Sequence, residues 1–206
     1  MPCITRRISA AVARRAFLGL LVTGSAVAMA AFASPGRASS LSSRTAHSFS
    51  FPSIDGGTLR MRDYAGRAVL VVNTASRCGF TNQYSDLQKL HERYAAQGLT
   101  IIGVPSNDFG QQEPGTEEEI RAFCSGTYGV QFPMTGKTQV RGASAHPFYR
   151  WARDELGARN APRWNFHKYL IGRDGRLLEA FPSHVSPMAP SMRGAVEAAL
   201  QAPSST

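Results

Sequence analysis

The chain has 206 residues, of which 43% are hydrophobic and 18% charged, and its formal net charge is +9. This length accommodates one domain with a substantial core and is too short for two ordinary domains. The charge does not indicate nucleic-acid binding, because no basic patch with interleaved aromatic residues accompanies it. Six arginines precede the first acidic residue, Asp55. They are Arg6, Arg7, Arg14, Arg15, Arg37 and Arg44.

The first segment has the pattern of an export signal. Residues 16–34 carry no charge, and the sequence Arg-Arg-Ala-Phe-Leu (residues 14–18) overlaps their start. Twin arginines before an uncharged apolar stretch are typical of the bacterial twin-arginine signal. Small residues that suit cleavage follow at 31–33 and 36–38. We therefore expect residues 1–38 to be cleaved and the mature protein to be periplasmic or secreted.

Cleavage after Ala38 would change both the charge and the cysteine count. It removes five arginines and no acidic residue, so the net charge falls from +9 to +4. It also removes Cys3 and leaves Cys78 and Cys124, an even number for an oxidising compartment. An uncleaved membrane anchor and an organelle transit peptide are the alternatives, although transit peptides lack such an apolar core. No other uncharged run is long enough to span a bilayer, so we expect no stable membrane insertion after cleavage.

A polar tail and a hairpin are expected next. Residues 39–47 are rich in serine and predict a disordered tail, followed by one domain over residues 48–202. Apolar residues alternate with others on both sides of Asp-Gly-Gly (residues 55–57), which predicts a β-hairpin. These apolar residues are Phe49, Phe51, Leu59 and Met61.

Two apolar runs further along predict buried strands. Residues 67–73 and 99–104 are rich in β-branched side chains without alternation, as in strands covered on both faces. Between them we expect a helix that is capped by Thr81 or Asn82 and stops at Gly98. Its apolar stripe consists of Tyr84, Leu87, His91 and Tyr94. A strand–helix–strand unit of this kind places its two strands in parallel.

The second half of the chain predicts further helices and a hairpin. Thr-Glu-Glu-Glu (residues 116–119) is a capping box that starts a short helix through Ser125. Residues 147–156 predict a helix ending at Gly157. Residues 165–181 predict a hairpin that turns at Asp-Gly, and residues 190–200 a weak final helix.

Cys78 lies where the first buried strand gives way to the helix, and we expect it in the first helical turn. Unpaired N–H groups and the helix macrodipole stabilise a thiolate there, and the thiolate is the nucleophilic form of cysteine. The carboxyl end of such a strand is also where open α/β sheets bind ligands. The motif is Cys-x-x-Thr, so Cys78 has no local disulfide partner. The alternative is an inert core cysteine.

Three further segments accompany Cys-Gly-Phe-Thr (residues 78–81). They are Asn-Asp-Phe-Gly-Gln-Gln-Glu-Pro-Gly (107–115), Phe-Pro-Met (132–134) and Trp-Asn-Phe-His-Lys-Tyr-Leu (164–170). Their order and spacing resemble the cysteine-containing, thioredoxin-dependent branch of the glutathione peroxidase family. The resemblance covers nearly the whole mature chain. It implies an α/β thioredoxin-like fold, a central mixed sheet flanked by helices, with an added N-terminal β-hairpin. It also implies a peroxidase that reduces hydrogen peroxide and organic hydroperoxides, in response to oxidative stress.

By motif, the resemblance implies a catalytic tetrad of Cys78, Gln112, Trp164 and Asn165, with Cys78 as the peroxidatic residue. Amide and indole N–H groups are neutral donors, which can hold a thiolate and stabilise the departing peroxide oxygen. Because these donors are uncharged, they form no ion pair with the thiolate. An ion pair would lower the pKa of the thiol, and the nucleophilicity of a thiolate falls as that pKa falls. A buried Trp-Asn pair that only packs and turns the chain is the alternative.

Cys124 lies in a segment similar to the one in which two-cysteine members of the family keep a resolving cysteine. The resemblance implies that oxidised Cys78 forms a disulfide with Cys124, and that a thioredoxin-like protein or glutathione then reduces it, with no bound cofactor. Alternatively, Cys124 is a core residue, because it shares an apolar stripe with Ile120. A disulfide needs Cα atoms within about 7 Å. We therefore expect the short helix, interrupted by Gly126 and Gly129, to unwind.

The sequence departs from the family pattern in two places. Pro-Ser-Asn-Asp-Phe (residues 105–109) stands where many members have Pro-Cys-Asn-Gln-Phe, so a cysteine is absent and Asp108 replaces an amide. The segment between Gly157 and Trp164 lacks the insertion that builds tetramer contacts in some members. We therefore expect a monomer or a weak dimer.

Two other functions fit these residues. One is a peroxide sensor that passes its disulfide to a partner protein. The other, from a different class, is an exported thioredoxin-fold binding protein or metallochaperone. Copper-delivery proteins need paired cysteines with histidine, and the five histidines of this chain have no metal-ligand spacing, so we expect no metal.

Overall fold

Residues 44–204 are described by the structure, a computed structural model. They belong to one compact unit. The expected export signal over 1–38 and most of the expected tail lie outside the described residues. Among the helices of the described segment, none has the length and hydrophobicity needed to cross a bilayer.

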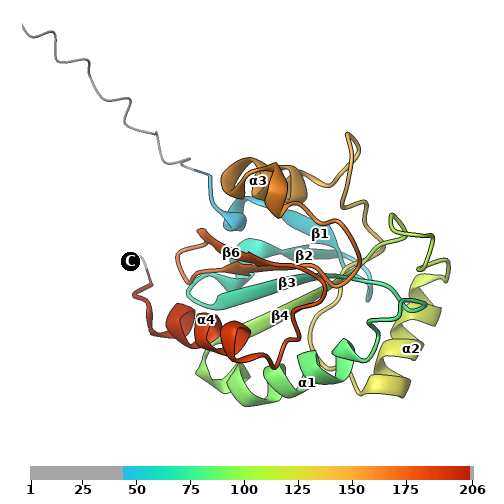
Figure 1. The fold of residues 1–206 in the computed structure, drawn as a ribbon, viewed down its shortest axis with the longest axis horizontal. Helices are drawn as coiled ribbons and strands as arrows, with labels where there is room; N and C mark the ends of the chain where they lie inside the picture. The colour runs from blue at the N-terminus through green and yellow to red at the C-terminus, as the bar shows by residue number, and fades with distance from the viewer. Residues whose placement is uncertain (1–43, 205–206) are drawn as a thin grey trace, which may run out of the picture. The chain divides into compact units, whose positions relative to one another are not determined.

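A four-stranded mixed sheet forms the centre of the fold, in the order β4-β3-β5-β6 (Figure 1). β3 (Ala68–Thr74) pairs in parallel with β4 (Leu99–Pro105) and antiparallel with β5 (Lys168–Ile171). β6 (Leu177–Phe181) completes the sheet beside β5. Every residue of β3 and β4 is buried, as the runs without alternation predicted. The parallel unit and the hairpin over 165–181 are confirmed.

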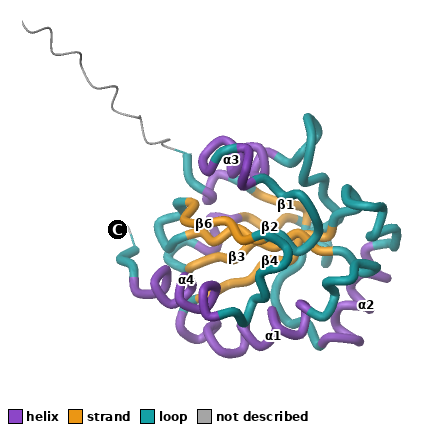
Figure 2. Tube along the Cα trace, in the orientation of Figure 1, coloured by secondary structure: helices purple, strands orange, loops and turns teal. Residues whose placement is uncertain are grey.

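Within residues 44–204, four α-helices lie around this sheet, and Figure 2 colours the helical segments purple. They are α1 (Gln83–Tyr94), α2 (Glu117–Tyr128), α3 (Pro147–Leu156) and α4 (Pro190–Gln201). In Figure 1, α3 lies on one side of the sheet, and α1 and α4 lie on the other. The predicted helices over 147–156 and 190–200 are confirmed, the second with one residue more at its end.

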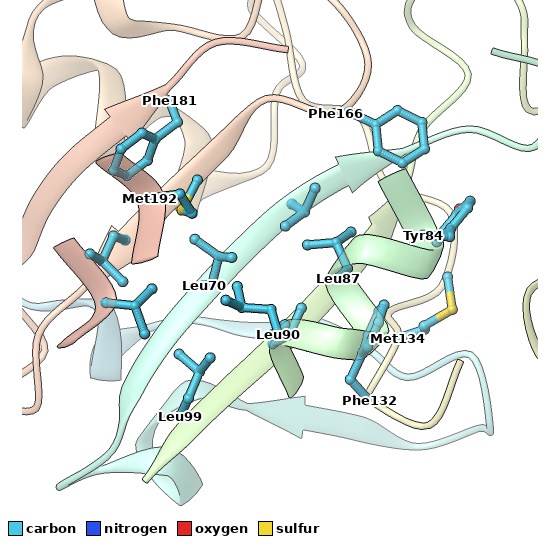
Figure 3. Close-up of a cluster of buried hydrophobic side chains, with 14 of the residues drawn as sticks. Leu70, Tyr84, Leu87, Leu90, Leu99, Phe132, Met134, Phe166, Phe181 and Met192 are labelled. Carbon is cyan, nitrogen blue, oxygen red and sulfur yellow. The ribbon is translucent and has the colours of Figure 1, made fainter. Parts of the chain in front are cut away.

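Alternating side chains of β3 divide the core into two clusters. Leu70 packs in the cluster formed with α1 and α4, where Figure 3 shows it near Leu87 and Met192. Val69 and Val71 point to the opposite face and pack in the cluster formed with α3 and the N-terminal hairpin. Because apolar cover on both faces holds β3, the carboxyl end of the strand has a defined position from which the next turn begins.

The N-terminal hairpin consists of β1 (Ser50–Pro52) and β2 (Thr58–Arg60), with Phe51 opposite Leu59. Both side chains are buried, so the predicted hairpin is confirmed. The expectation of disorder through residue 47 is wrong at its end, because Ala46–Ser48 form a 3-10 turn with Ala46 fully buried. The Ala46 N–H donates to the Gly175 carbonyl at 2.8 Å. Because Gly175 lies in a distant turn, the composition of residues 39–47 could not predict this contact.

α1 begins at Gln83, directly after Asn82, which is one of the two cap positions that the sequence predicted. Thr81 N–H donates to the Cys78 carbonyl and Gln83 N–H to the Phe80 carbonyl, so successive turns precede the helix. Asn82 makes no side-chain cap. Cys78 therefore lies in a turn five residues before α1, and the expectation that it occupies the first helical turn is wrong. The reason is tertiary: the Gln83 side chain is held by partners far along the chain, Ser183 and Lys168.

α2 is longer than expected. Its capping box is confirmed, with Glu119 N–H donating to Thr116 Oγ1 at 3.3 Å and Thr116 N–H to Glu119 Oε2 at 2.8 Å. The helix continues through Gly126 and ends at Gly129, whose φ is 63°. The expected interruption at Gly126 is therefore wrong. A mid-helix glycine costs about 1 kcal/mol relative to alanine, which the cap and the buried side chains of Ile120 and Cys124 offset.

Candidate active site

Cys78 lies just beyond the carboxyl end of β3, four residues after Thr74. Its side chain is 4% exposed and belongs to the core cluster on the α1 side of the sheet. It is a free thiol, as is Cys124. No hydrogen bond from any residue in the described range 44–204 reaches its sulfur. The position at the carboxyl edge of the sheet is the one that the sequence predicted.

Two consecutive hydrogen bonds tie the turn before Cys78 to the loop that carries Gln112. Arg77 N–H donates to the Gln112 carbonyl at 3.0 Å. Ser76 N–H donates to Glu113 Oε2 at 2.9 Å. Cys78 is therefore attached, through the two residues before it, to the backbone and side chain of the Gln112 loop.

Asn165 and Gln112 meet directly. Asn165 is fully buried, and its Nδ2 donates to Gln112 Oε1 at 3.0 Å and to the Phe109 carbonyl at 3.5 Å. This contact occupies the acceptor of the Gln112 amide and leaves its Nε2 donor without a partner among the described residues. Among the described residues, the Asn165 amide therefore bonds to Gln112 and Phe109 and makes no hydrogen bond to the Cys78 sulfur.

Trp164 lies over the same loop. The centroids of the Trp164 and Phe109 rings are 6.0 Å apart. The indole also lies close to Gly110, since a Cβ atom at this glycine would be 3.5 Å from the ring. The Trp164 carbonyl accepts a hydrogen bond from Asn73 Nδ2 at 3.1 Å, and the side chain is 39% exposed. The structure thus brings Gln112, Trp164 and Asn165 into one cluster, joined to Cys78 through Arg77.

Backbone strain is concentrated in this cluster. Gln111, with a φ of 51°, and Phe166, with a φ of 61°, are the two non-glycine residues with positive φ in the described range. Gln111 precedes Gln112, and Phe166 follows Asn165. Such conformations are uncommon outside glycine and persist where surrounding contacts impose them. At Phe166 the ring is fully buried, and its N–H donates to the Asn73 carbonyl at 2.6 Å.

Cys124 is buried on α2, in the same core cluster as Cys78, with 1% exposure. Burial raises the pKa of its thiol to about 11, an effect that the neighbouring Tyr84 hydroxyl partly offsets. In the folded arrangement Cys124 is therefore a neutral thiol. The pair Cys78 and Cys124 is reduced, and α2 is intact around Cys124.

Asp108, the departure from the family pattern, has a structural role. Its Oδ2 accepts hydrogen bonds from Val140 N–H at 2.6 Å and from Arg141 N–H at 3.1 Å. Arg141 also lies over the Phe109 ring, 5.5 Å from its centroid. The carboxylate therefore fixes the segment that borders the Gln112 loop.

Three residues near the site escaped sequence reasoning. Asn73 positions the Trp164 backbone, and Glu113 holds the Cys78 turn. Lys168 is fully buried on β5, where its Nζ donates to Gln83 Oε1, the Val185 carbonyl and, at 3.4 Å, the Ser183 carbonyl. Burial lowers the pKa of Lys168 to about 7. A charged residue inside a strand with buried neighbours was the only local signal.

No group of three or more potential ligand side chains that could hold a metal ion occurs within residues 44–204.

The family model for glutathione peroxidase matches residues 46–153. The chain belongs to the glutathione peroxidase family. It is 46% identical over 143 residues to a glutathione peroxidase of Lactococcus lactis, covering 68% of this chain and 91% of that one. It is 42% identical over 151 residues to the hydroperoxy fatty acid reductase gpx1 of Synechocystis, covering 69% and 89%. The thioredoxin/glutathione peroxidase BtuE of Escherichia coli is 36% identical over 169 residues, covering 71% and 92%.

Solved structures agree on the fold. The apo crystal structure of Trgpx has a TM-score of 0.64 and 32% identity, covering 79% of this chain and 99% of that one. A thioredoxin-family thiol:disulfide interchange protein of Chlorobium tepidum has a TM-score of 0.55 at 18% identity, covering 74% and 92%. The predictions of the glutathione peroxidase family, of a peroxidase, and of a thioredoxin-like α/β fold are therefore confirmed.

Proposed function

We propose that Cys78 is the peroxidatic residue of this peroxidase and reduces hydrogen peroxide and organic hydroperoxides. The observation that carries the proposal is the cluster of Gln112, Trp164 and Asn165 joined by Arg77 to the Cys78 turn. Strained backbone on both sides of the cluster supports it, because such strain is concentrated at functional sites.

In the proposed first step, the Cys78 thiolate attacks one peroxide oxygen. A sulfur–oxygen bond forms, the oxygen–oxygen bond breaks, and the departing hydroxide or alkoxide takes a proton to become water or an alcohol. The Gln112 Nε2 amide and the Trp164 indole N–H are the donors we assign to the charge that develops, since neither is used by another described residue. Asn165 holds Gln112 in the orientation that presents this donor.

The proposed second step regenerates the thiol through Cys124. The Cys124 sulfur attacks the Cys78 sulfenic acid, the sulfur–sulfur bond forms, the sulfur–oxygen bond breaks, and water leaves. A thioredoxin-like protein or glutathione then reduces the disulfide, in keeping with the E. coli relative whose name includes both. Because Cys124 is buried on an intact helix, this step requires the end of α2 to open.

The setting of the reaction is a further part of the proposal. The export signal predicted over residues 1–38 would place the mature protein in the periplasm or outside the cell, as a monomer or weak dimer that protects against oxidative stress. The reductant would then also have to be present outside the cytoplasm. Amino-terminal sequencing of the exported product tests this, and retention of Met1 would contradict it.

The deciding experiment is peroxide consumption by the mature protein with thioredoxin or glutathione as the electron donor. Cys78→Ser should abolish turnover, and Cys124→Ser should abolish thioredoxin-coupled turnover while leaving one round of Cys78 oxidation. Activity that survives Cys78→Ser would overturn the peroxidatic assignment. Full thioredoxin-coupled turnover by Cys124→Ser would overturn only the resolving step.

A peroxide-sensing relay is the second candidate, and the burial of Cys124 favours it. A buried, neutral thiol at Cys124 is a poor nucleophile, so the Cys78 sulfenic acid would persist long enough to react with a cysteine of another protein. Peroxide treatment followed by peptide mapping distinguishes the two. A Cys78 to Cys124 crosslink supports the peroxidase cycle, and mixed disulfides with a second protein support the relay.

A further inference from the structure

Glu113 is an unusual residue for the position it occupies. Its side chain is only 1% exposed, and it forms no ion pair with any residue in the described part of the chain. Burial raises the pKa of this carboxyl group. Taking a carboxylate out of water is costly, and the nearby charges of Lys137 and Arg77 offset the effect of burial only in part, so the hydrogen bonds of Glu113 carry weight.

The contacts of Glu113 join three segments of the site. Its Oε2 accepts the Ser76 N–H at 2.9 Å, two residues before Cys78. Its own N–H donates to Asn107 Oδ1 at 2.8 Å, in the loop after β4. Together with the bond from Arg77 N–H to the Gln112 carbonyl, residues 112 and 113 hold two successive N–H groups of the Cys78 turn.

The turn has little other support on this side. A pocket of about 350 Å³ opens beside it and is lined by Ser76, Arg77 and Glu113 together with Ile120 and Phe123 of α2. Side chains that border an open cavity lose packing contacts there. Cys78 packs in the core on its other side, but on the side facing the pocket the turn depends on its two hydrogen bonds.

We infer that Glu113 is a positioning residue for peroxide reduction, whose carboxylate holds the Ser76 N–H and so keeps Cys78 in register with Gln112. The inference rests on the proposed peroxidatic role of Cys78. A hydrogen bond from a backbone N–H to a carboxylate is stronger than a neutral one, which suits a contact that must hold a reactive turn beside a cavity. This role requires a side chain at position 113 that is long enough to bring an acceptor oxygen to the Ser76 N–H.

The test compares three substitutions by the rate at which hydrogen peroxide oxidises Cys78, followed by alkylation and mass spectrometry. Glu113→Ala removes the acceptor, and Glu113→Asp shortens it by one methylene, so both should lose about tenfold or more, as expected for misplacement of a reacting group. Glu113→Gln keeps an acceptor oxygen at the same length and should stay within about threefold of wild type. Glu119→Gln, on the wall of the same cavity but bonded only to Thr116, is the matched control and should react as wild type does.

Amide hydrogen exchange at Ser76 provides a second readout, which does not depend on peroxide chemistry. Protection should fall in Glu113→Ala and persist in Glu113→Gln. Wild-type rates in Glu113→Ala, or equal losses in Gln and Ala with Asp retained, would overturn the inference. If the wild-type thiol does not react with peroxide, the proposed function fails, and unchanged Ser76 protection in Glu113→Ala still overturns the positioning role on its own. Should Glu113→Ala not fold, the comparison of Asp with Gln decides.

Discussion

Replacement of Lys168 by methionine should make the stability of this protein respond differently to pH. The Lys168 Nζ lies in the core and donates to Gln83 Oε1 at 2.5 Å and to the Val185 carbonyl at 2.6 Å, with no carboxylate within ion-pair distance in the described chain. Burial lowers the pKa of the ammonium group from 10.5 to about 7. Methionine has a similar length and no titrating group, so Lys168→Met removes this titration.

The size of the effect follows from that pKa difference. Below about pH 7 both the folded and the unfolded chain carry the proton, so the cost of burying the charge is fully present. Between pH 7 and 10.5 the unfolded chain binds a proton that the folded chain has released, and the free energy of unfolding rises with pH. One proton corresponds to about 1.4 kcal/mol per pH unit. From pH 7 to pH 9, wild type should therefore gain about 2–3 kcal/mol relative to Lys168→Met.

Urea unfolding followed by circular dichroism at pH 6, 7, 8 and 9 measures this difference directly. The two proteins share all other titrating groups, and His167, whose pKa the Lys168 charge also lowers, titrates mostly below pH 7. Lys89→Met, at a lysine whose side chain is 62% exposed, is the control and should give a flat difference. A wild-type minus Lys168→Met difference that stays constant or falls between pH 7 and 9 would refute the argument that burial depresses this lysine.

Two further predictions concern α2. In the folded Cys78→Ser protein, Cys124 should resist iodoacetamide at pH 8, because its buried thiol has a pKa of about 11, and it should react once urea unfolds the chain. Rapid native labelling seen by mass spectrometry would show that α2 opens readily without oxidation. Thr116→Ala should lower the free energy of unfolding by about 1 kcal/mol, because it removes one half of the capping box. No change in the urea midpoint would mean that packing alone holds this helix end.

Most of the secondary structure was predictable because its signals are local. The unalternated runs that became β3 and β4, the Asp-Gly turns of both hairpins and the capping box of α2 each lie within a few residues of sequence. The order of the motifs around Cys78, Gln112, Trp164 and Asn165 was enough to predict the family. Local patterns failed where distant partners decide, as at Ala46, which is anchored by Gly175, and at Gln83, which is held by Lys168 and Ser183.

The candidate site likewise combines features set by local sequence with features set by distant contacts. The sequence by itself determined which residue types are present: a thiol after a buried strand, neutral donors in separate motifs and a second thiol on a helix. Only the tertiary structure decided that Asn165 donates to Gln112, that Glu113 accepts from the turn before Cys78, and that Cys124 is buried as a neutral thiol. These outcomes depend on burial and on hydrogen bonds between segments far apart in the chain. Desolvation and long-range contacts arise only when the sheet and helices have packed, so no local pattern encodes them.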